Sequence, residues 1–228
     1  MKYKAVIFDL FGTLVDKFPI DESIDILKQM AAVLEVSDRD MVKLWFETFD
    51  ERHGGDFRNL EDDTRYVAEK LGASPDEAQI KKAAQINLDY VENAIKPRSD
   101  TVETLTCLRE RGYKVGLLSN WSHEVPTVWD SVPLSRLFDA AVFSSKVGML
   151  KPDPRIYLMV AEKLEVRPEE CLYIGDGASR ELAGAQAVGM DPVLIDNKGK
   201  DSEHPVNAEA EEWQGNRITS LAEIMTLL

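Results

Sequence analysis

A group of polar side chains in this sequence could carry chemistry, because each directly follows a short apolar run long enough for a buried strand. In an open parallel sheet the carboxyl ends of the strands meet at one crevice, so these side chains are expected to converge there. They are Asp9, Ser119, Asn120, Ser144, Ser145 and Asp176. The pattern predicts one site assembled from distant parts of the chain.

The side-chain types in this group suit attack on an electrophile that carries negative charge. The carboxylate of Asp9 could attack phosphorus, or a carbon that bears a leaving group, and divide one displacement into two easier steps. Ser119 and Asn120 offer hydroxyl and amide donors to a phosphoryl or carboxylate oxygen. Lys151 stands before Pro152, where the chain is expected to turn, and its ammonium group could neutralise carboxylates and bind an anionic substrate.

Two acidic residues after the apolar run Cys171–Ile174 could hold a metal ion. Asp176 comes directly after Gly175, and Glu181 lies five residues further on. Carboxylate oxygens suit Mg²⁺, which accepts one or two protein carboxylates together with water and substrate oxygens. The alternative is that Asp176 only caps the helix that follows it.

The segments that would position these residues alternate between strands and helices, which is typical of parallel βαβ units with right-handed crossovers. Apolar, β-branched runs predict strands, and apolar residues at three- and four-residue steps predict amphipathic helices. The expected strands are Ala5–Phe8, Lys114–Leu118, Ala140–Phe143, Cys171–Ile174 and Pro192–Ile195. The expected helices in the same part are Asp100–Arg111, a stretch with Trp129 and Leu137, Pro154–Leu164, Glu181–Val188 and Ser220–Leu228, with an irregular Lys198–Asn216.

The segment between Asp16 and Pro97 contains no convincing strand and has a helical pattern throughout. Helices are expected at Ile20–Leu34, from an N-cap at Ser37 or Asp38 to the stop at His53-Gly54-Gly55, at Thr64–Leu71 and at Asp76–Ile95. We therefore predict an α/β fold in which residues 1–15 and 97–228 form a doubly wound, parallel-sheet, Rossmann-like core. Residues 16–96 are expected to form an inserted all-helical cap, and its position after the first strand favours a lid over the site.

Composition narrows the class of partner. The 228 residues are 44% hydrophobic and 30% charged, and the formal net charge is −14. Nucleic-acid binding needs a basic surface, and anionic membranes attract basic segments, so neither partner is expected. Cys107 and Cys171 have no spacing typical of a metal site. No apolar run reaches the length of a membrane span and the chain enters its first strand at once, so we expect a cytoplasmic location.

Four motifs resemble those of the haloacid dehalogenase-like hydrolases, in the family's order and spacing. They are Tyr3–Asp16 (YKAVIFDLFGTLVD), Leu117–Asn120 (LLSN), Lys151–Pro154 (KPDP) and Tyr173–Glu181 (YIGDGASRE). The resemblance implies that Asp9 is a covalent nucleophile. The implied metal ligands are Asp9, the main-chain carbonyl of Phe11 and Asp176, with Glu181 at an outer position where the family more often has Asp. The other implied catalytic residues are Thr13, Ser119 and Lys151, and the implied substrate contacts are Phe11, Gly12, Ser119, Asn120 and Lys151.

Phe11 departs from the phosphatases of this family, which carry Asp two residues after the nucleophile. That Asp protonates the leaving oxygen and then activates water, worth roughly 10²–10⁴-fold in rate, and phenylalanine can do neither. An aromatic residue here resembles the 2-haloacid dehalogenases, in which halide leaves without protonation. Those enzymes usually lack the Gly-Asp pair, work without metal and use a cap arginine, where this chain has Leu44-Trp45-Phe46. The candidates for a substitute are Arg39, Arg52 and Arg58.

The retained Asp176 favours the phosphatase pattern, because a metal site beside the nucleophile serves no purpose in a metal-free halide displacement. The leading prediction is a Mg²⁺-dependent phosphatase of a small phosphomonoester that forms a covalent intermediate on Asp9. The alternatives are a 2-haloacid dehalogenase, with halide displaced by Asp9, and a protein that binds a phosphate ligand with little turnover. The expected partner is a small anionic substrate, and the sequence indicates neither its identity nor the oligomeric state.

Overall fold

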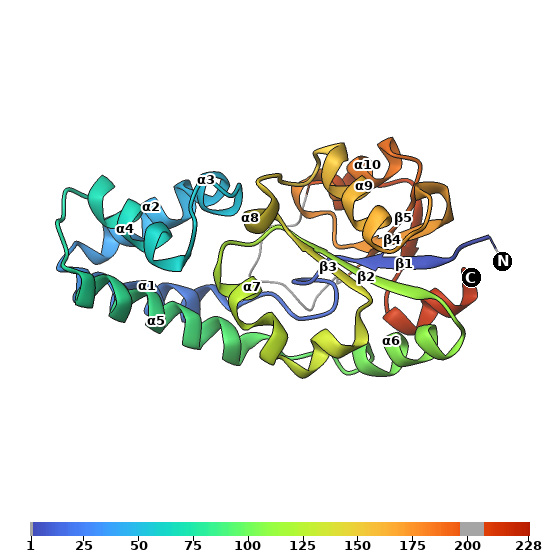
Figure 1. Cartoon of the computed structure of the whole chain (residues 1–228), viewed down its shortest axis with the longest axis horizontal. Coiled ribbons are helices and arrows are strands. Elements are labelled where there is room, and N and C mark those ends of the chain that lie inside the picture. Colours follow the sequence, from blue (N-terminus) through green and yellow to red (C-terminus); the bar gives the residue numbers. More distant parts are fainter. Residues whose placement is uncertain (1, 197–207) are drawn as a thin grey trace.

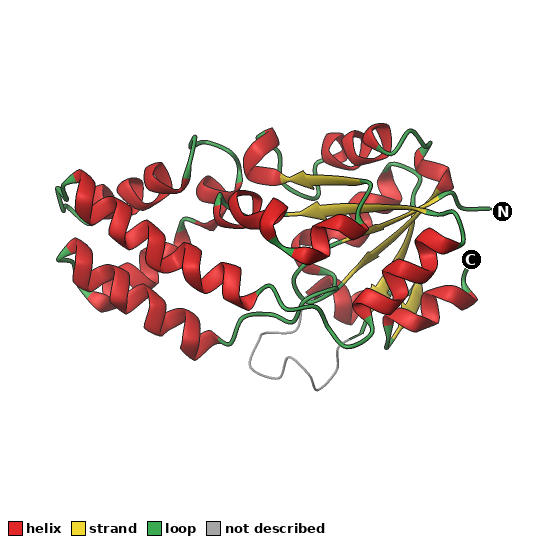
Figure 2. Ribbon diagram, turned by 60° about the horizontal axis from the view of Figure 1, so that its bottom comes forward, coloured by secondary structure: helices red, strands yellow, loops and turns green. Residues whose placement is uncertain are grey.

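A parallel sheet forms the centre of the fold in this computed structural model, which describes residues 2–196 and 208–228 (Figure 1). Its strands lie in the order β3-β2-β1-β4-β5-β6, and each neighbouring pair is parallel (Figure 2). Because the chain adds strands first on one side of β1 and then on the other, the sheet is doubly wound. The strands are β1 Ala5–Phe8, β2 Lys114–Ser119, β3 Ala140–Phe143, β4 Cys171–Gly175, β5 Asp191–Ile195 and β6 Asn216–Ile218.

Strand β1 lies in the middle of the sheet and is buried on both faces. Successive side chains of a strand point to opposite faces, so Val6 and Phe8 pack in one hydrophobic cluster and Ala5 and Ile7 in another. All four side chains are fully buried, as expected for a central parallel strand covered on both sides. Its uninterrupted apolar sequence is a consequence of this double burial.

Helices cover both faces of the sheet. Helices α9 (Pro154–Lys163) and α10 (Glu181–Ala187) pack on the face of Ala5 and Ile7, and α6 (Thr101–Glu110) and the 3₁₀ helix η5 (Leu221–Thr226) pack on the other. Each buries one apolar stripe against the strands. The shorter elements are α7 Glu124–Val128, η1 Trp129–Ser131, η2 Pro133–Leu137, α8 Ser144–Val147, η3 Pro168–Glu170, η4 Ala178–Arg180 and α11 Ala208–Glu212.

The insertion between β1 and α6 is all-helical and lies at one end of the molecule, on the left in Figure 1. It has a hydrophobic core of its own, which includes Leu27 and Met30 of α1 and Ile80 of α5. Side chains of Ser37, Asn59 and Asp76 accept main-chain N–H bonds at the starts of α2, α4 and α5. The helices are α1 Ile20–Leu34, α2 Asp38–Glu47, α3 Phe49–His53, α4 Leu60–Lys70 and α5 Glu77–Ala94.

The two connections between the insertion and the rest of the chain run side by side. Val15 and Pro97 form an antiparallel bridge. The Arg98 N–H donates to the Leu14 carbonyl at 3.0 Å, and the Thr101 hydroxyl donates to the same carbonyl at 2.7 Å. The chain therefore leaves and re-enters the sheet-containing part at one place. On this basis we propose residues 1–15 and 97–228 as the core and 16–96 as the cap.

The single helix predicted between Ser37 or Asp38 and His53-Gly54-Gly55 is divided in two. Helix α2 ends at Glu47 and α3 begins at Phe49, with Thr48 between them. The Thr48 hydroxyl donates to the main-chain carbonyl of Leu44 at 2.8 Å, and a side chain that competes for backbone groups in this way disfavours a continuous helix.

The C-terminal region differs from the sequence prediction. The predicted irregular segment Lys198–Asn216 includes helix α11 and the first residue of β6, and its residues 198–207 lie outside the described part. Strand β6 is an edge strand in which only Ile218 is buried, so its sequence lacks an apolar run. The predicted helix Ser220–Leu228 is a shorter 3₁₀ helix, η5.

Among residues 2–196 and 208–228, none of the helices combines the length and the apolar character that crossing a bilayer requires. The cytoplasmic location stays a prediction.

Candidate active site

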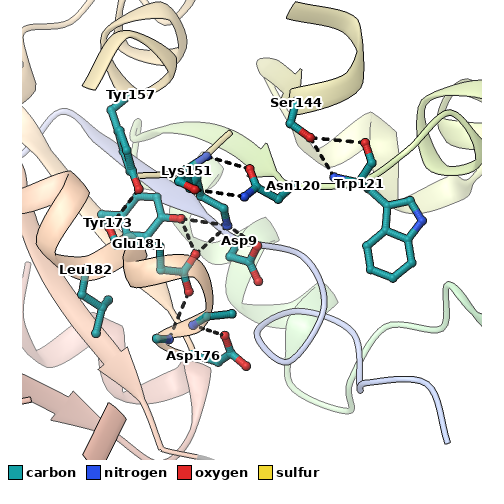
Figure 3. A network of polar contacts seen from close by, with 12 residues as sticks. Asp9, Asn120, Trp121, Ser144, Lys151, Tyr157, Tyr173, Asp176, Glu181 and Leu182 are labelled. Atoms are coloured by element: carbon teal, nitrogen blue, oxygen red, sulfur yellow. Dashed lines mark hydrogen bonds and ion pairs between the residues drawn. The ribbon is translucent and has the colours of Figure 1, made fainter. Parts of the chain in front are cut away.

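The carboxyl ends of three neighbouring strands bring the predicted site residues together (Figure 3). Asp9 directly follows β1, and its main-chain N–H donates to the Ile174 carbonyl of β4 at 2.9 Å. Ser119 ends β2, and Asp176 follows β4. The three side chains are buried. The convergence expected for the ends of parallel strands is therefore present.

Lys151 lies between two carboxylates. Its Nζ is 2.6 Å from Asp9 Oδ1 and 2.6 Å from Glu181 Oε2. The Tyr173 hydroxyl donates to the same Glu181 oxygen at 2.7 Å, and the Gly177 N–H donates to Glu181 Oε1 at 3.1 Å. Burial alone would lower the pKa of Lys151, but the charges of Asp9 and Glu181 outweigh it and raise this pKa. Lys151 is therefore a buried cation.

Asn120 fixes the main chain of Lys151. The Lys151 N–H donates to Asn120 Oδ1 at 2.9 Å, and Asn120 Nδ2 donates to the Lys151 carbonyl at 3.3 Å (Figure 3). Both ends of the amide are used in this pair of bonds. The arrangement ties the end of β2 to the loop before α9, and so places the Lys151 ammonium group at the ends of the strands.

Three buried carboxylates crowd this site. One oxygen each from Asp9, Asp176 and Glu181 lie within 4.8 Å of one another. Burial raises the pKa of Asp9, and the charge of Asp176 adds to the shift against the opposing effect of Lys151. Burial likewise raises the pKa of Glu181 to about 8, with Asp9 and Asp176 adding to it. Burial and mutual repulsion thus disfavour the ionised forms of Asp9 and Glu181, and a further positive charge would stabilise them.

Lys17 supplies a second cation, which sequence reasoning did not identify. Its Nζ is 2.7 Å from Asp176 Oδ2. Gly12 makes this approach possible, because a Cβ atom there would lie 2.5 Å from Asp176 Oδ2 and 2.8 Å from Lys17 Cε. Its φ of +85° also favours glycine. No periodic pattern marks Lys17, whose position depends on how the loop after β1 folds.

The donor set fits a divalent metal ion. The carboxylates of Asp9 and Asp176 are the hard oxygen donors that Mg²⁺ prefers, and Mg²⁺ keeps water or substrate oxygens in its remaining positions. Both oxygens of Glu181 already accept hydrogen bonds, which suits the outer position expected from the sequence.

Aromatic side chains form one wall of the site. The ring of Phe11 lies with its centroid 4.6 Å from that of Phe18 and 4.3 Å from that of Trp121. The main-chain N–H of Trp121 donates to Ser144 Oγ at 3.0 Å, which fixes the main chain from which the indole extends. Together with Phe46 and Phe49, these rings face a cavity of about 530 Å³, within the usual size of a ligand pocket.

Most of the predicted residues line this cavity. Asp9, Phe11, Ser119, Asn120 and Lys151 do so, together with Lys17. Thr13 belongs to the loop after β1, and its hydroxyl is fully buried with no hydrogen-bond partner among the described residues. The cavity thus has one charged, polar end at Asp9 and one aromatic wall.

Of the cap arginines, only Arg52 is buried. Arg39 is exposed, and Arg58 is an exposed residue paired with Asp62 at 2.8 Å. Arg52 lies in α3 and contacts the ring of Trp45. Met41, Trp45, Thr48 and Arg52 are buried and follow one another at four-, three- and four-residue steps, so Arg52 continues the buried face of α2 across the break at Thr48.

Curated relatives of both expected kinds are similar to this chain. A glyceraldehyde 3-phosphate phosphatase from Methanopyrus kandleri is 27% identical over 205 residues, which cover 86% of this chain and 85% of the relative. (S)-2-haloacid dehalogenase 4A from Burkholderia cepacia is 28% identical over 221 residues, covering 92% of this chain and 93% of the relative. The comparison supports a hydrolase and does not decide between the two activities.

Solved structures and the family comparison agree on the fold. A 2-haloacid dehalogenase from Pseudomonas syringae matches with a TM-score of 0.71 and 22% identity, over 99% of this chain and 97% of that one. The family model for haloacid dehalogenase-like hydrolases matches residues 3–189, which include every motif discussed above. The chain therefore belongs to the haloacid dehalogenase-like hydrolases.

Proposed function

We propose that the protein is a Mg²⁺-dependent hydrolase that cleaves a small phosphomonoester through a covalent intermediate on Asp9. The observation that carries this proposal is the cluster of Asp9, Asp176 and Glu181. Because burial and mutual repulsion raise the pKa of Asp9 and Glu181, their ionised forms would be stabilised by a further positive charge. The similarity to a glyceraldehyde 3-phosphate phosphatase supports a small phosphate ester as substrate.

The proposed ligands of Mg²⁺ are Asp9, the main-chain carbonyl of Phe11 and Asp176, with Glu181 at the outer position. The bound ion would act as a Lewis acid on a phosphoryl oxygen. Lys17 competes with the ion, because its ammonium group contacts the Asp176 carboxylate. Residues 16–96 would act as a lid, since Phe18, Phe46 and Phe49 from this segment line the cavity that contains Asp9.

In the proposed first step, a carboxylate oxygen of Asp9 attacks phosphorus. A bond forms between that oxygen and phosphorus, and the bond to the ester oxygen breaks with its electron pair left on the departing group. Lys151 favours the ionised form of Asp9 that the attack requires. Lys151 and the Ser119 hydroxyl would donate hydrogen bonds to the phosphoryl oxygens, which gain charge during the transfer.

Phe11 sets the expected kinetics. Its side chain can neither protonate the departing oxygen nor activate the water that later hydrolyses the aspartyl phosphate. Substrates whose leaving group is stable as an anion should therefore react fastest in the first step. The second step should limit turnover.

A second candidate is displacement of halide from a 2-haloacid by Asp9. The observation that favours it is the aromatic wall of Phe11, Phe18 and Trp121, which offers an apolar surface to a carbon–halogen bond. Here the new bond joins an Asp9 oxygen to carbon, and halide leaves with the bonding pair, so no proton donor is required. The similarity to a haloacid dehalogenase from Burkholderia cepacia supports this reading.

Parallel assays distinguish the two candidates. Release of inorganic phosphate from phenyl phosphate and of chloride from 2-chloropropionate would be measured with Mg²⁺ and with chelator. The phosphatase proposal expects phosphate release that needs Mg²⁺. Halide release in chelator, without phosphate release, would overturn it in favour of the second candidate, and tight phosphate binding without turnover of either substrate would favour a binding protein.

Asp9→Asn tests the covalent intermediate in the same assays. The amide cannot attack as a carboxylate does, so we expect loss of turnover. Asp153→Asn is the matched control, because Asp153 caps α9 at the surface and does not line the cavity. Near wild-type turnover of Asp9→Asn, with deamidation excluded by mass spectrometry, would show that Asp9 is not the nucleophile.

A further inference from the structure

A second cavity, of about 110 Å³, lies beyond the aromatic wall of the Asp9 cavity. Phe18, Phe46, Phe49 and Trp121 line both cavities, so the two meet along these rings. The second cavity has room for several water-sized groups. Its polar lining residues come from the cap and from the loop after β2, and include Arg52, Asn87, Ser122 and Glu124.

Arg52 is a buried cation in the wall of this second cavity, with 2% of its surface exposed. Its guanidinium carbon lies 3.8 Å from the centre of the Trp45 ring, its Nε donates to Thr48 Oγ1 at 3.3 Å, and its Nη2 donates to the Trp45 carbonyl at 2.7 Å. Within residues 2–196 and 208–228, Arg52 forms no ion pair and its Nη1 donates no hydrogen bond. The charges of Glu124, Asp63 and Glu51 stabilise the guanidinium without forming an ion pair with it, so a directly bound anion would add to this stabilisation.

The neighbouring carboxylates make their hydrogen bonds to groups other than Arg52, and Asp63 Oδ1 is buried without a partner among the described residues. Glu124 accepts hydrogen bonds from the side chains of Asn87 and Ser122. Asp63 lies 2.9 Å from the ring nitrogen of His123. Burial raises the pKa of both Glu124 and Asp63 and the charge of Arg52 opposes this rise, so both carboxylates interact with the guanidinium electrostatically but neither forms an ion pair with it. The cavity itself is the open side from which an anion can approach Arg52.

We propose that Arg52 is a specificity-determining residue that binds a carboxylate at the far end of the substrate. The inference rests on the proposed function for the phosphate end, which would lie at Asp9 and Lys151. The substrate class would be a phosphomonoester whose compact apolar or aromatic body carries a carboxylate. That body would pass between the rings that line both cavities, where aromatic groups pack favourably, and the planar guanidinium matches the geometry of a carboxylate.

Benzoate is the probe for this site, because it has the proposed carboxylate and ring but no group that can react at Asp9. Binding would be measured by isothermal calorimetry and by tryptophan fluorescence, since Trp45 and Trp121 both line the second cavity. Benzamide has the same shape without the charge. We expect wild-type protein to bind benzoate at least 10-fold more tightly than benzamide, as a charged hydrogen bond implies.

Arg52→Met should weaken benzoate binding roughly 10- to 100-fold, because the charged partner is lost. The matched control is Arg58→Met, an exposed arginine of the same cap that lines neither cavity, which should bind benzoate as the wild type does. Saturating inorganic phosphate should leave benzoate affinity within a few-fold of its value without phosphate, since the two anions occupy different ends. Thermal melting of each variant shows that it is folded.

Equal affinity of wild-type protein for benzoate and benzamide would overturn the proposal, and this comparison needs no variant. Unchanged benzoate binding by folded Arg52→Met, or displacement of benzoate by phosphate, would also overturn it. Because the assay involves no turnover, its result is separate from that of the phosphate-release assays. Arg52-dependent binding without phosphate release would support the carboxylate site and refute the proposed phosphatase.

Discussion

Replacing Lys151 with methionine tests whether its ammonium group allows the buried carboxylates to coexist. Methionine keeps an unbranched side chain but has no charge. In Lys151→Met, Asp9 and Glu181 lose a shared partner that lies 2.6 Å from each of them. All three side chains are almost fully buried, so water cannot readily replace the ammonium group.

The expected loss of stability follows from this burial. Removing one partner of a buried ion pair costs about 3–5 kcal/mol. For a chain of this size, 1 kcal/mol changes Tm by roughly 2–4 °C. Lys151→Met should therefore melt roughly 6–20 °C below the wild type in the presence of chelator.

The loss of stability in Lys151→Met should become smaller as the pH falls. Without the ammonium group, the pKa values of Asp9 and Glu181 rise further above their values in the unfolded chain, which are 3.8 and 4.5 in the absence of perturbation. The folded variant then binds more protons than the unfolded one in the window above those values, so its stability increases on acidification. The difference in Tm between variant and wild type should accordingly be smaller at pH 5 than at pH 8.

Scanning calorimetry from pH 5 to pH 8 provides the measurement. Lys163→Met is the control, because Lys163 is an exposed residue of α9 and its replacement should change stability by at most about 0.5 kcal/mol. Lys151→Met combined with Glu181→Gln should regain part of the loss, since one of the uncompensated charges is gone. Equal melting of Lys151→Met and wild type at pH 8, or a loss independent of pH, would refute this account of the site.

Two other predictions concern position 11 and the cap. Because the second step should limit turnover, the wild type should release a burst of phenol from phenyl phosphate before its steady state. Phe11→Asp should remove this burst and raise steady-state turnover by up to roughly 10²–10⁴-fold, because it restores a base. A folded, Mg²⁺-binding variant that is no faster would contradict this. Burial and the charge of Arg52 hold the pKa of His53 well below 6.5, so only the unfolded chain takes up that proton. Urea unfolding should therefore show the wild type losing about 1.4 kcal/mol per pH unit below 6.5 relative to His53→Gln, whereas equal slopes would argue against a buried neutral imidazole.

The sheet is the part of the fold that could be predicted from the sequence, for a physical reason. Strands buried on both faces, such as Ala5–Phe8 and Cys171–Gly175, need apolar residues at every position, and this produces unmistakable runs. The edge strand Asn216–Ile218 buries one residue and produces no run. The positions of Asp9 and Asp176 could be predicted for the same reason, because a polar residue at the end of such a run lies at the carboxyl end of a strand.

Contacts that depend on loop conformation or on distant pairing could not be predicted. Lys17 reaches Asp176 only because the loop after β1 turns at Gly12. Arg52 lines a cavity that is completed by distant segments, and the link between Asp63 and His123 joins residues of the cap and core that no local pattern relates. The sequence contains these side chains, but tertiary packing decides which of them face a cavity.

Phe11 links the chemistry of the site to its choice of substrate. Its ring removes the acid and base that a phosphatase would have at this position, and the same ring packs with Phe18 and Trp121 to form the wall of the cavity. An alkyl phosphate would react slowly, because its alkoxide needs a proton to leave, and it would bind weakly, because its chain packs less well against aromatic rings than a ring does. An aryl phosphate has a leaving group that is stable as an anion and a ring that packs against the wall. In the proposed phosphatase, the missing acid would therefore cost least for the substrates that this cavity would bind best, so the aromatic wall and the absence of a catalytic acid would act as one selective feature.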